Sequence, residues 1–240
     1  MRSFAISVLL LGGTIPSMAN ADFIVSSWDL LTYVYQGASG EDDYVTSTVV
    51  QNPYHTTHFA SIGDTTSQTN YDISWLLDFG GFDIQAAHMA EGAEGGVTSA
   101  LSSGHIWITP TEDLLLSLDA AYSYEFSSSA AMLAGLTIGV SYADQPGGIF
   151  GQMEQAVTFP GEPLSGTLAI QADIILPANE TWVLGYSTKV HTFSGSAGST
   201  VTGDGHVSFT ITPEPTTASL LALGGLMLIR RRRRGRKRRM

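Results

Sequence analysis

The chain of 240 residues contains no cysteine, so it has neither disulfides to stabilise it nor a thiolate nucleophile. Basic residues are also almost absent from most of its length. Between residues 22 and 212 there is no arginine, and Lys189 is the only lysine. This stretch therefore cannot supply an arginine clamp for a phosphate or a carboxylate.

Acidic residues dominate the same stretch. Of the 22 aspartates and glutamates, 21 lie between residues 22 and 212, and with one lysine they give it a formal charge of −20. A surface of this charge repels nucleic acid, anionic lipid and acidic polysaccharide. We therefore expect no nucleic-acid partner, and neutral polysaccharide and cations remain as ligand classes.

The amino terminus has the parts of a secretory signal peptide. A short positively charged segment precedes an apolar run over residues 4–15, and Ala19 and Ala21 form an A-x-A cleavage site. We predict a cleaved signal peptide over residues 1–21. The apolar run is too short for a stable transmembrane helix, which favours cleavage over retention.

The carboxyl terminus combines three segments, residues 213–215, 216–229 and 230–239. The first is Pro-Glu-Pro, whose prolines lack N–H donors and should end the last strand. The second is apolar and rich in helix formers, and as a helix it would measure about 21 Å against a bilayer core of about 30 Å. The third should stay cytoplasmic by the positive-inside rule. Its main topology signal is the run Arg230, Arg231, Arg232, Arg233 and Arg234.

This tail resembles the PEP-CTERM protein-sorting domain of exported proteins in Gram-negative bacteria that make exopolysaccharide. The resemblance covers residues 212–240 only, and the basic tail is longer than is usual in that family. It implies that a membrane-embedded exosortase recognises Pro213, Glu214 and Pro215 and removes the anchor. The chain would then pass from the inner membrane to the cell surface or the extracellular matrix. An ordinary anchor and a nucleic-acid-binding arginine tail are the alternatives.

Residues 22–212 repeatedly alternate apolar and polar residues, which is typical of strands with one buried face. We predict one all-β domain, an antiparallel jelly-roll-like β-sandwich of roughly ten to twelve short strands. Residues 22–35 fit either a strand or a loop, and Gly80-Gly81 is read as a break between strands. The predicted strands include residues 44–50, 58–62, 73–79, 97–109, 114–125, 133–142, 164–176, 182–191 and 207–212.

Two histidine pairs and one acidic segment are the candidate metal ligands. His55 and His58 lack the neighbouring glutamate of a helix-borne zinc site. His191 and His206 would lie across a hairpin if the last two strands pair. Glu41-Asp42-Asp43 could hold Ca²⁺ but lacks the alternating aspartate pattern of a calcium loop. We predict no metal site, with Ca²⁺ as the alternative.

The glycines around Asp204 predict a turn at residues 203–205, which is a weaker calcium candidate than the acidic segment. Catalytic candidates are equally sparse. No Gly-x-Ser-x-Gly elbow is present. Asp119 and Glu125 share one strand face, but six residues at about 3.3 Å separate them by roughly 20 Å, too far for a glycosidase pair. We therefore predict that the protein is not an enzyme.

Exposed aromatic residues offer the remaining binding candidates. Trp28, Trp107 and the pair Tyr33 and Tyr35 could stack on sugar rings or pack in the core. Taken together, the sequence predicts an exported surface or matrix protein with a structural or adhesive role in an exopolysaccharide or biofilm setting. The alternatives are a carbohydrate- or calcium-binding module and a jelly-roll glycan hydrolase or lyase.

Overall fold

The computed structural model of the chain describes residues 23–48, 51–76, 79–144, 148–158, 164–194 and 197–213. The predicted signal peptide with Ala19 and Ala21, the apolar segment and the arginine-rich tail lie outside these ranges, as do Glu214 and Pro215. Among the described residues, no helix has the length and apolar character needed to cross a membrane.

Twelve antiparallel strands build the described part of the chain, which confirms the predicted all-β class and the upper end of the predicted strand number. The strands are β1 (Phe23–Gln36), β2 (Glu41–Ser47), β3 (Tyr54–Ile62), β4 (Thr65–Leu76), β5 (Phe79–Glu91), β6 (Thr98–Pro110), β7 (Leu114–Phe126), β8 (Met132–Tyr142), β9 (Gly148–Val157), β10 (Ser165–Leu176), β11 (Trp182–Thr192) and β12 (Thr200–Pro213).

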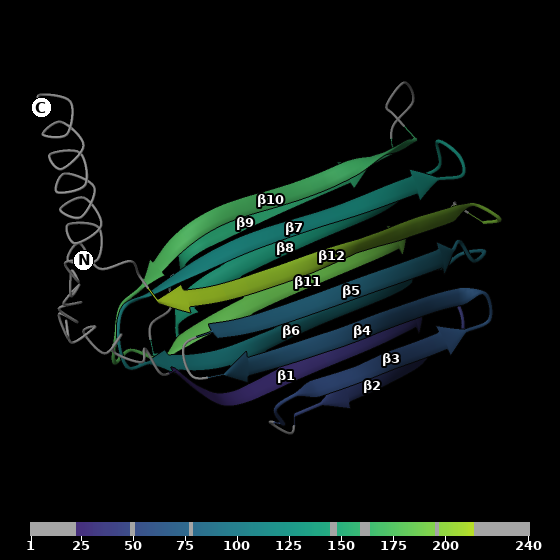
Figure 1. The fold of residues 1–240 in the computed structure, drawn as a ribbon. Helices are drawn as coiled ribbons and strands as arrows, with labels where there is room; N and C mark the ends of the chain where they lie inside the picture. The colour runs from purple at the N-terminus through teal and green to yellow at the C-terminus, as the bar shows by residue number, and fades with distance from the viewer. Residues whose placement is uncertain are drawn as a thin grey trace, which may run out of the picture.

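The strands form two six-stranded sheets. Sheet A has the order β2-β1-β6-β11-β8-β9, and sheet B has the order β10-β7-β12-β5-β4-β3. The two sheets lie one behind the other with their strands nearly aligned (Figure 1). Contacts between β1 and β4, β5 and β6, and β11 and β12 show that the sheets pack face to face. The space between them is the core.

The predicted alternation sets which residues enter this core. In β11, Trp182, Leu184, Tyr186 and Val190 are buried, as the period of two requires. In β10 the inward side chains include Leu168 and Ile170. Each of these strands therefore presents one face to the core and the other to solvent.

Glycines on inward positions make room for aromatic rings of neighbouring strands. Gly203 of β12 and Gly166 of β10 both flank Tyr124 of β7 in the register, and the Tyr122 ring lies against Gly203. A Cβ atom at Gly203 would collide with the Tyr122 side chain. Such glycine positions depend on the neighbouring strand, not on a turn.

Two predicted breaks are therefore wrong. Gly80 and Gly81 lie inside β5, where Gly80 packs against the Phe23 ring, and residues 203–205 lie in the middle of β12. Residues 23–36 are a strand, the longest of sheet A. The predicted hairpin between the last two strands is also wrong, because β11 belongs to sheet A and β12 to sheet B.

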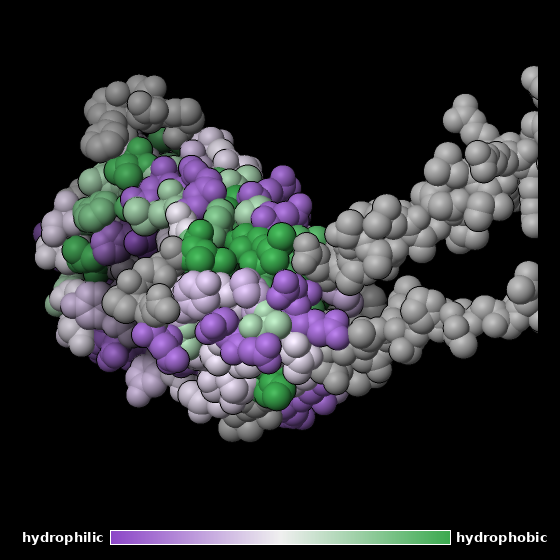
Figure 2. Space-filling model, turned by 90° about the vertical axis from the view of Figure 1, so that its left-hand side faces the viewer, coloured by the Kyte–Doolittle hydropathy of each residue, from purple (hydrophilic) through white to green (hydrophobic). Residues whose placement is uncertain are grey.

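The first and last described residues lie at the same end of the sandwich, on the left in Figure 1. Phe23 is paired with Pro110, and Pro213 is paired with Leu114. Figure 2 looks onto this end and shows hydrophobic residues gathered near its middle. The last strand thus runs one residue further than predicted and ends on the first proline of the Pro-Glu-Pro sequence.

Candidate functional site

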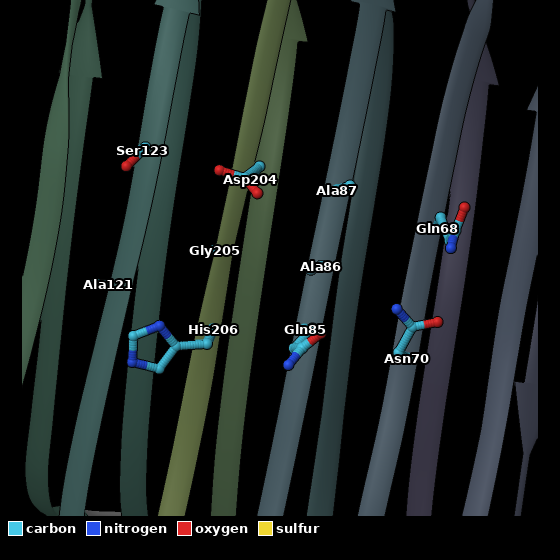
Figure 3. A pocket seen from close by; sticks show the side chains of 10 residues that line it. All are labelled: Gln68, Asn70, Gln85, Ala86, Ala87, Ala121, Ser123, Asp204, Gly205 and His206. Carbon is cyan, nitrogen blue, oxygen red and sulfur yellow. The ribbon is translucent and has the colours of Figure 1, made fainter.

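The outer face of sheet B carries two adjoining hollows of about 470 and 690 Å³. They share Asn70 of β4, Gln85 of β5 and His206 of β12, and together we call them the sheet B furrow. The furrow is open to solvent and lined mainly by polar groups. Figure 3 shows how its first hollow lies across several strands.

The strand register places the polar groups of the furrow in one row. His206 lies opposite Gln85, Gln85 opposite Asn70, and Asn70 opposite Thr57 of β3. Because neighbouring strands are about 4.8 Å apart, the row presents a polar group at that interval across four strands. The Thr57 hydroxyl donates to Asn70 Oδ1 at 2.7 Å, which fixes the orientation of the amide.

Small side chains deepen the furrow on both sides of Asp204. Ala87 of β5 and Ala121 of β7 line the first hollow together with Ser123 and Asp204. Gln68 of β4 lies opposite Ala87 in the register. Short side chains beside longer amides leave an uneven floor, so a ligand could reach the amides from the side as well as from above.

A second row of the same face is acidic. Asp72 of β4 lies directly opposite Asp83 of β5, and His55 Nδ1 lies 2.9 Å from Asp72 Oδ1. Asp119 of β7 accepts a hydrogen bond from Gln171 at 2.8 Å and lies 3.6 Å from His206 Nε2. These carboxylates are exposed, so they lack the apolar enclosure that prepares a carboxyl group for general acid catalysis.

His88 in the core lies beside a serine and a threonine, an arrangement that could suggest a catalytic site. His88 Nδ1 is 2.9 Å from Ser67 Oγ, and its Nε2 is 3.0 Å from Thr188 Oγ1 in the opposite sheet. Burial lowers the pKa of His88 to about 3, so the imidazole is neutral at pH 7. Ser67 donates to the Leu101 carbonyl oxygen at 3.0 Å. The serine is fully buried, so the group ties the sheets together and offers no nucleophile to a substrate.

The predicted histidine candidates are not brought together. His55 is exposed on the outer face of sheet B, whereas His58 is buried on the inner face, hydrogen-bonded to Ser47 through Nε2 at 2.9 Å. His191 lies on sheet A beside Ser99 at 2.5 Å, and His206 lies on sheet B. Within the described residues, no group of three or more His, Cys, Asp or Glu side chains is arranged to hold a metal ion.

The acidic and aromatic candidates also separate. Residues 41–43 begin β2, and Asp43 accepts a hydrogen bond from the Ser61 amide at 2.8 Å. Trp28 is buried in the core and cannot stack on a sugar. Trp107, Tyr33 and Tyr35 are partly exposed on the outer face of sheet A.

Sequence reasoning missed the amides of the sheet B furrow. Asn70 and Gln85 are 15 positions apart and meet only because β4 and β5 pair in the observed register. An available signal was the run of residues 65–72, in which polar side chains occupy both faces of one strand. Polar side chains on both faces of a strand indicate either hydrogen-bonding partners on the buried face or a binding role for the exposed face.

Comparisons with known proteins give no family. No protein-family model matches the sequence, and no curated protein matches it. Among solved structures, infectious bursal disease virus Gx strain has a TM-score of 0.31 at 13% identity, covering 82% of this chain and 58% of that one. Arthrobacter globiformis T6 isomalto-dextranase complexed with panose has a TM-score of 0.21 at 11% identity, covering 78% and 32%. Scores this low support no conclusion about this chain.

Proposed function

We propose that this chain is an exported, non-enzymatic protein of the cell surface or extracellular matrix, with a structural or adhesive role. In this proposal a jelly-roll-like sandwich is preceded by a signal peptide and followed by a transmembrane helix and an arginine-rich tail. An exosortase-type enzyme recognises Pro213, Glu214 and Pro215 and removes the tail while the protein is still in the inner membrane.

One observation carries the proposal: β12 ends on Pro213. The residue pairs with Leu114 and is the last of the ladder, so the Pro-Glu-Pro sequence begins where the sandwich ends. A proline at a strand terminus has no N–H to leave unpaired. The folded domain and the proposed recognition sequence therefore adjoin without a linker between them.

The non-enzymatic role is proposed from where the candidate catalytic side chains lie. The candidate acids Asp119 and Glu125 are exposed on one strand, six residues apart. The Ser67 and His88 pair is enclosed between the sheets. A stable sandwich with polar outer faces suits a protein that works by its surface.

The test compares wild-type protein with a variant in which residues 213–215 are Ala-Ala-Ala, in a host that has an exosortase. Mass spectrometry of surface-released wild-type protein should find no peptide from residues 230–239. The variant should be exported but keep its tail in the inner membrane. Tail peptides in the released wild-type protein would contradict sorting and leave a plain anchor.

Carbohydrate or calcium binding is the alternative role, and a glycan hydrolase or lyase is a third. Carbohydrate binding has a specific observation in its favour, the row of uncharged amides in the sheet B furrow.

A further inference from the structure

We propose that the sheet B furrow binds a chain of neutral polysaccharide laid across strands β3, β4, β5, β12 and β7. This inference rests on the carbohydrate-binding alternative above and is independent of how the tail is processed. It is carried by the amides of the furrow, by the charge of the lining and by one exposed aromatic ring.

The amides supply hydrogen-bonding groups with a defined direction. Asn70 Oδ1 accepts a hydrogen bond from the Thr57 hydroxyl, so the Nδ2 donors of Asn70 remain for a ligand. Within the described part of the chain, the side chains of Gln68 and Gln85 have no hydrogen-bond partner. A primary amide offers an acceptor and two donors in one plane, which matches the mixed donor and acceptor character of sugar hydroxyls.

The charge of the furrow disfavours anionic ligands. Asp72, Asp83 and Asp204 line it, and neither hollow has a lysine or an arginine in its lining. Phosphates, carboxylates and acidic polysaccharides are repelled by this lining. An apolar ligand would leave the amides without partners. A neutral polyhydroxyl ligand satisfies both amides and carboxylates.

Phe59 of β3 provides an apolar platform at one side of the furrow. Its side chain lies directly opposite Gln68 in the register and is 52% exposed on the outer face of sheet B. A large exposed aromatic side chain offers a wide apolar contact area and loses little conformational entropy when a ligand orders it. A sugar ring could stack on Phe59 while its hydroxyl groups reach Gln68.

The length of the sheet B furrow fits a chain of several sugars better than a single sugar. The two hollows are continuous through Asn70, Gln85 and His206 and extend from Thr57 on β3 to Ala121 on β7. These five neighbouring strands span about 19 Å at roughly 4.8 Å per gap. A chain laid across the strands would contact amides from several strands at once.

The test is affinity electrophoresis of the full chain in a non-ionic detergent without a sugar headgroup. Native gels contain dextran, galactomannan, xyloglucan or hydroxyethyl cellulose, with alginate as the anionic comparison. We expect at least one neutral polymer to retard the wild-type protein. Gln85→Leu should weaken this binding at least tenfold and Phe59→Ala severalfold, because the first removes central hydrogen bonds and the second a stacking surface.

Matched controls lie on the opposite sheet. Gln155→Leu removes an exposed amide of β9, and Tyr44→Ala removes an aromatic ring of β2 that is 60% exposed. Both should bind as the wild type does, and all four variants should keep its melting temperature. Three results would overturn the proposal: no retardation in any neutral polymer, equal retardation of wild type and Gln85→Leu, or retardation only in alginate with Ca²⁺. Each leaves the proposed sorting untouched, since tail removal is measured separately.

Discussion

The two ends of the space between the sheets differ in chemistry. At the end where the chain enters and leaves the sandwich, on the left in Figure 1, the buried side chains are large and apolar. They include Phe82, Ile106, Ile108, Leu114, Leu116, Trp182, Phe209 and Ile211. At the other end polar side chains are buried together with apolar ones such as Phe126, Met132 and Val201, and these polar side chains include Thr65, Ser67, His88, Thr98, Thr188 and Thr192. Single strands show the change, since the inward side of β6 passes from Thr98 and Ser102 to Ile106 and Ile108.

The comparison shows that the two ends are held by different interactions. The apolar end is stabilised by packing and the removal of apolar surface from water. The polar end is stabilised by hydrogen bonds from one sheet to the other. Thr32 donates to Thr69 at 3.0 Å, His88 meets Thr188 at 3.0 Å, and Tyr186 donates to the Tyr71 hydroxyl at 2.9 Å. Substitutions that create a cavity should therefore destabilise the apolar end most. The polar end should be sensitive to pH and to the loss of hydrogen-bond partners.

The largest expected effect is a cavity at the apolar end. Phe209→Ala removes a fully buried ring from β12 and should lower the free energy of unfolding by about 3–5 kcal/mol. Urea denaturation followed by tryptophan fluorescence measures this change. A loss below about 1 kcal/mol would show that the apolar end collapses onto the cavity and does not depend on tight packing.

Acid should act on the polar end through His88. Its pKa is about 3 in the folded state and near 6.5 when unfolded, so between these values the unfolded state binds a proton that the folded state does not. The contribution of neutral His88 to the free energy of unfolding is fully present above pH 6.5. It falls by about 1.4 kcal/mol per pH unit as the pH decreases toward 3. At pH 5 the loss should be about 2 kcal/mol.

The control for this pH dependence is His88→Gln, which keeps hydrogen-bonding groups but cannot titrate. Burial also lowers the pKa of His58 and of His191, where the Lys189 charge adds to the effect, so the variant should keep a smaller slope of the same sign. Urea denaturation at pH 7.5, 6 and 5 compares the slopes. Equal slopes for wild type and variant would show that His88 does not titrate as described.

Local patterns in the sequence predict which residues form strands better than they predict the role of each glycine. The alternation in β10 and β11 gives both their existence and their buried faces. The local sequence predicts breaks at Gly80 and Gly203, yet each glycine packs against a ring contributed by another strand. The partner ring is distant in sequence, so no local signal identifies it.

The same limit applies to the candidate site. The polar residues of β4 and β5 are visible in the sequence, but only the register makes neighbours of Asn70 and Gln85. The acidic character of residues 22–212 does follow from composition alone, and the furrow shares it, since aspartates line it without a lysine or an arginine. Net charge is a sum over residues and can be read from composition, whereas the candidate site depends on which strands pair and in which register.

A smaller effect should come from a glycine in the polar half of the core. Gly203→Ala forces a Cβ atom against Tyr122, so overpacking should cost about 1–3 kcal/mol. Gly139→Ala on the outer face of sheet A is the matched control, since a Cβ atom there meets nothing within 4 Å. That variant should be neutral or stabilised by up to about 1 kcal/mol. Equal melting temperatures for the two variants would contradict the role of Gly203 in seating the ring.

The smallest expected effect concerns the hydrogen bond between Thr32 and Thr69, which joins the sheets at the polar end. Thr69→Val leaves the Thr32 hydroxyl buried without this partner and should cost about 1–2 kcal/mol. The double variant Thr32→Val and Thr69→Val replaces both hydroxyls by methyl groups of similar shape, so it should regain most of that loss. A double-mutant cycle by urea denaturation measures the coupling between the two sites. If the double variant loses as much as the sum of the single variants, the hydroxyls are not coupled. The polar end would then be held by the shape of its side chains, as the apolar end is, and the contrast between the two ends would be one of composition only.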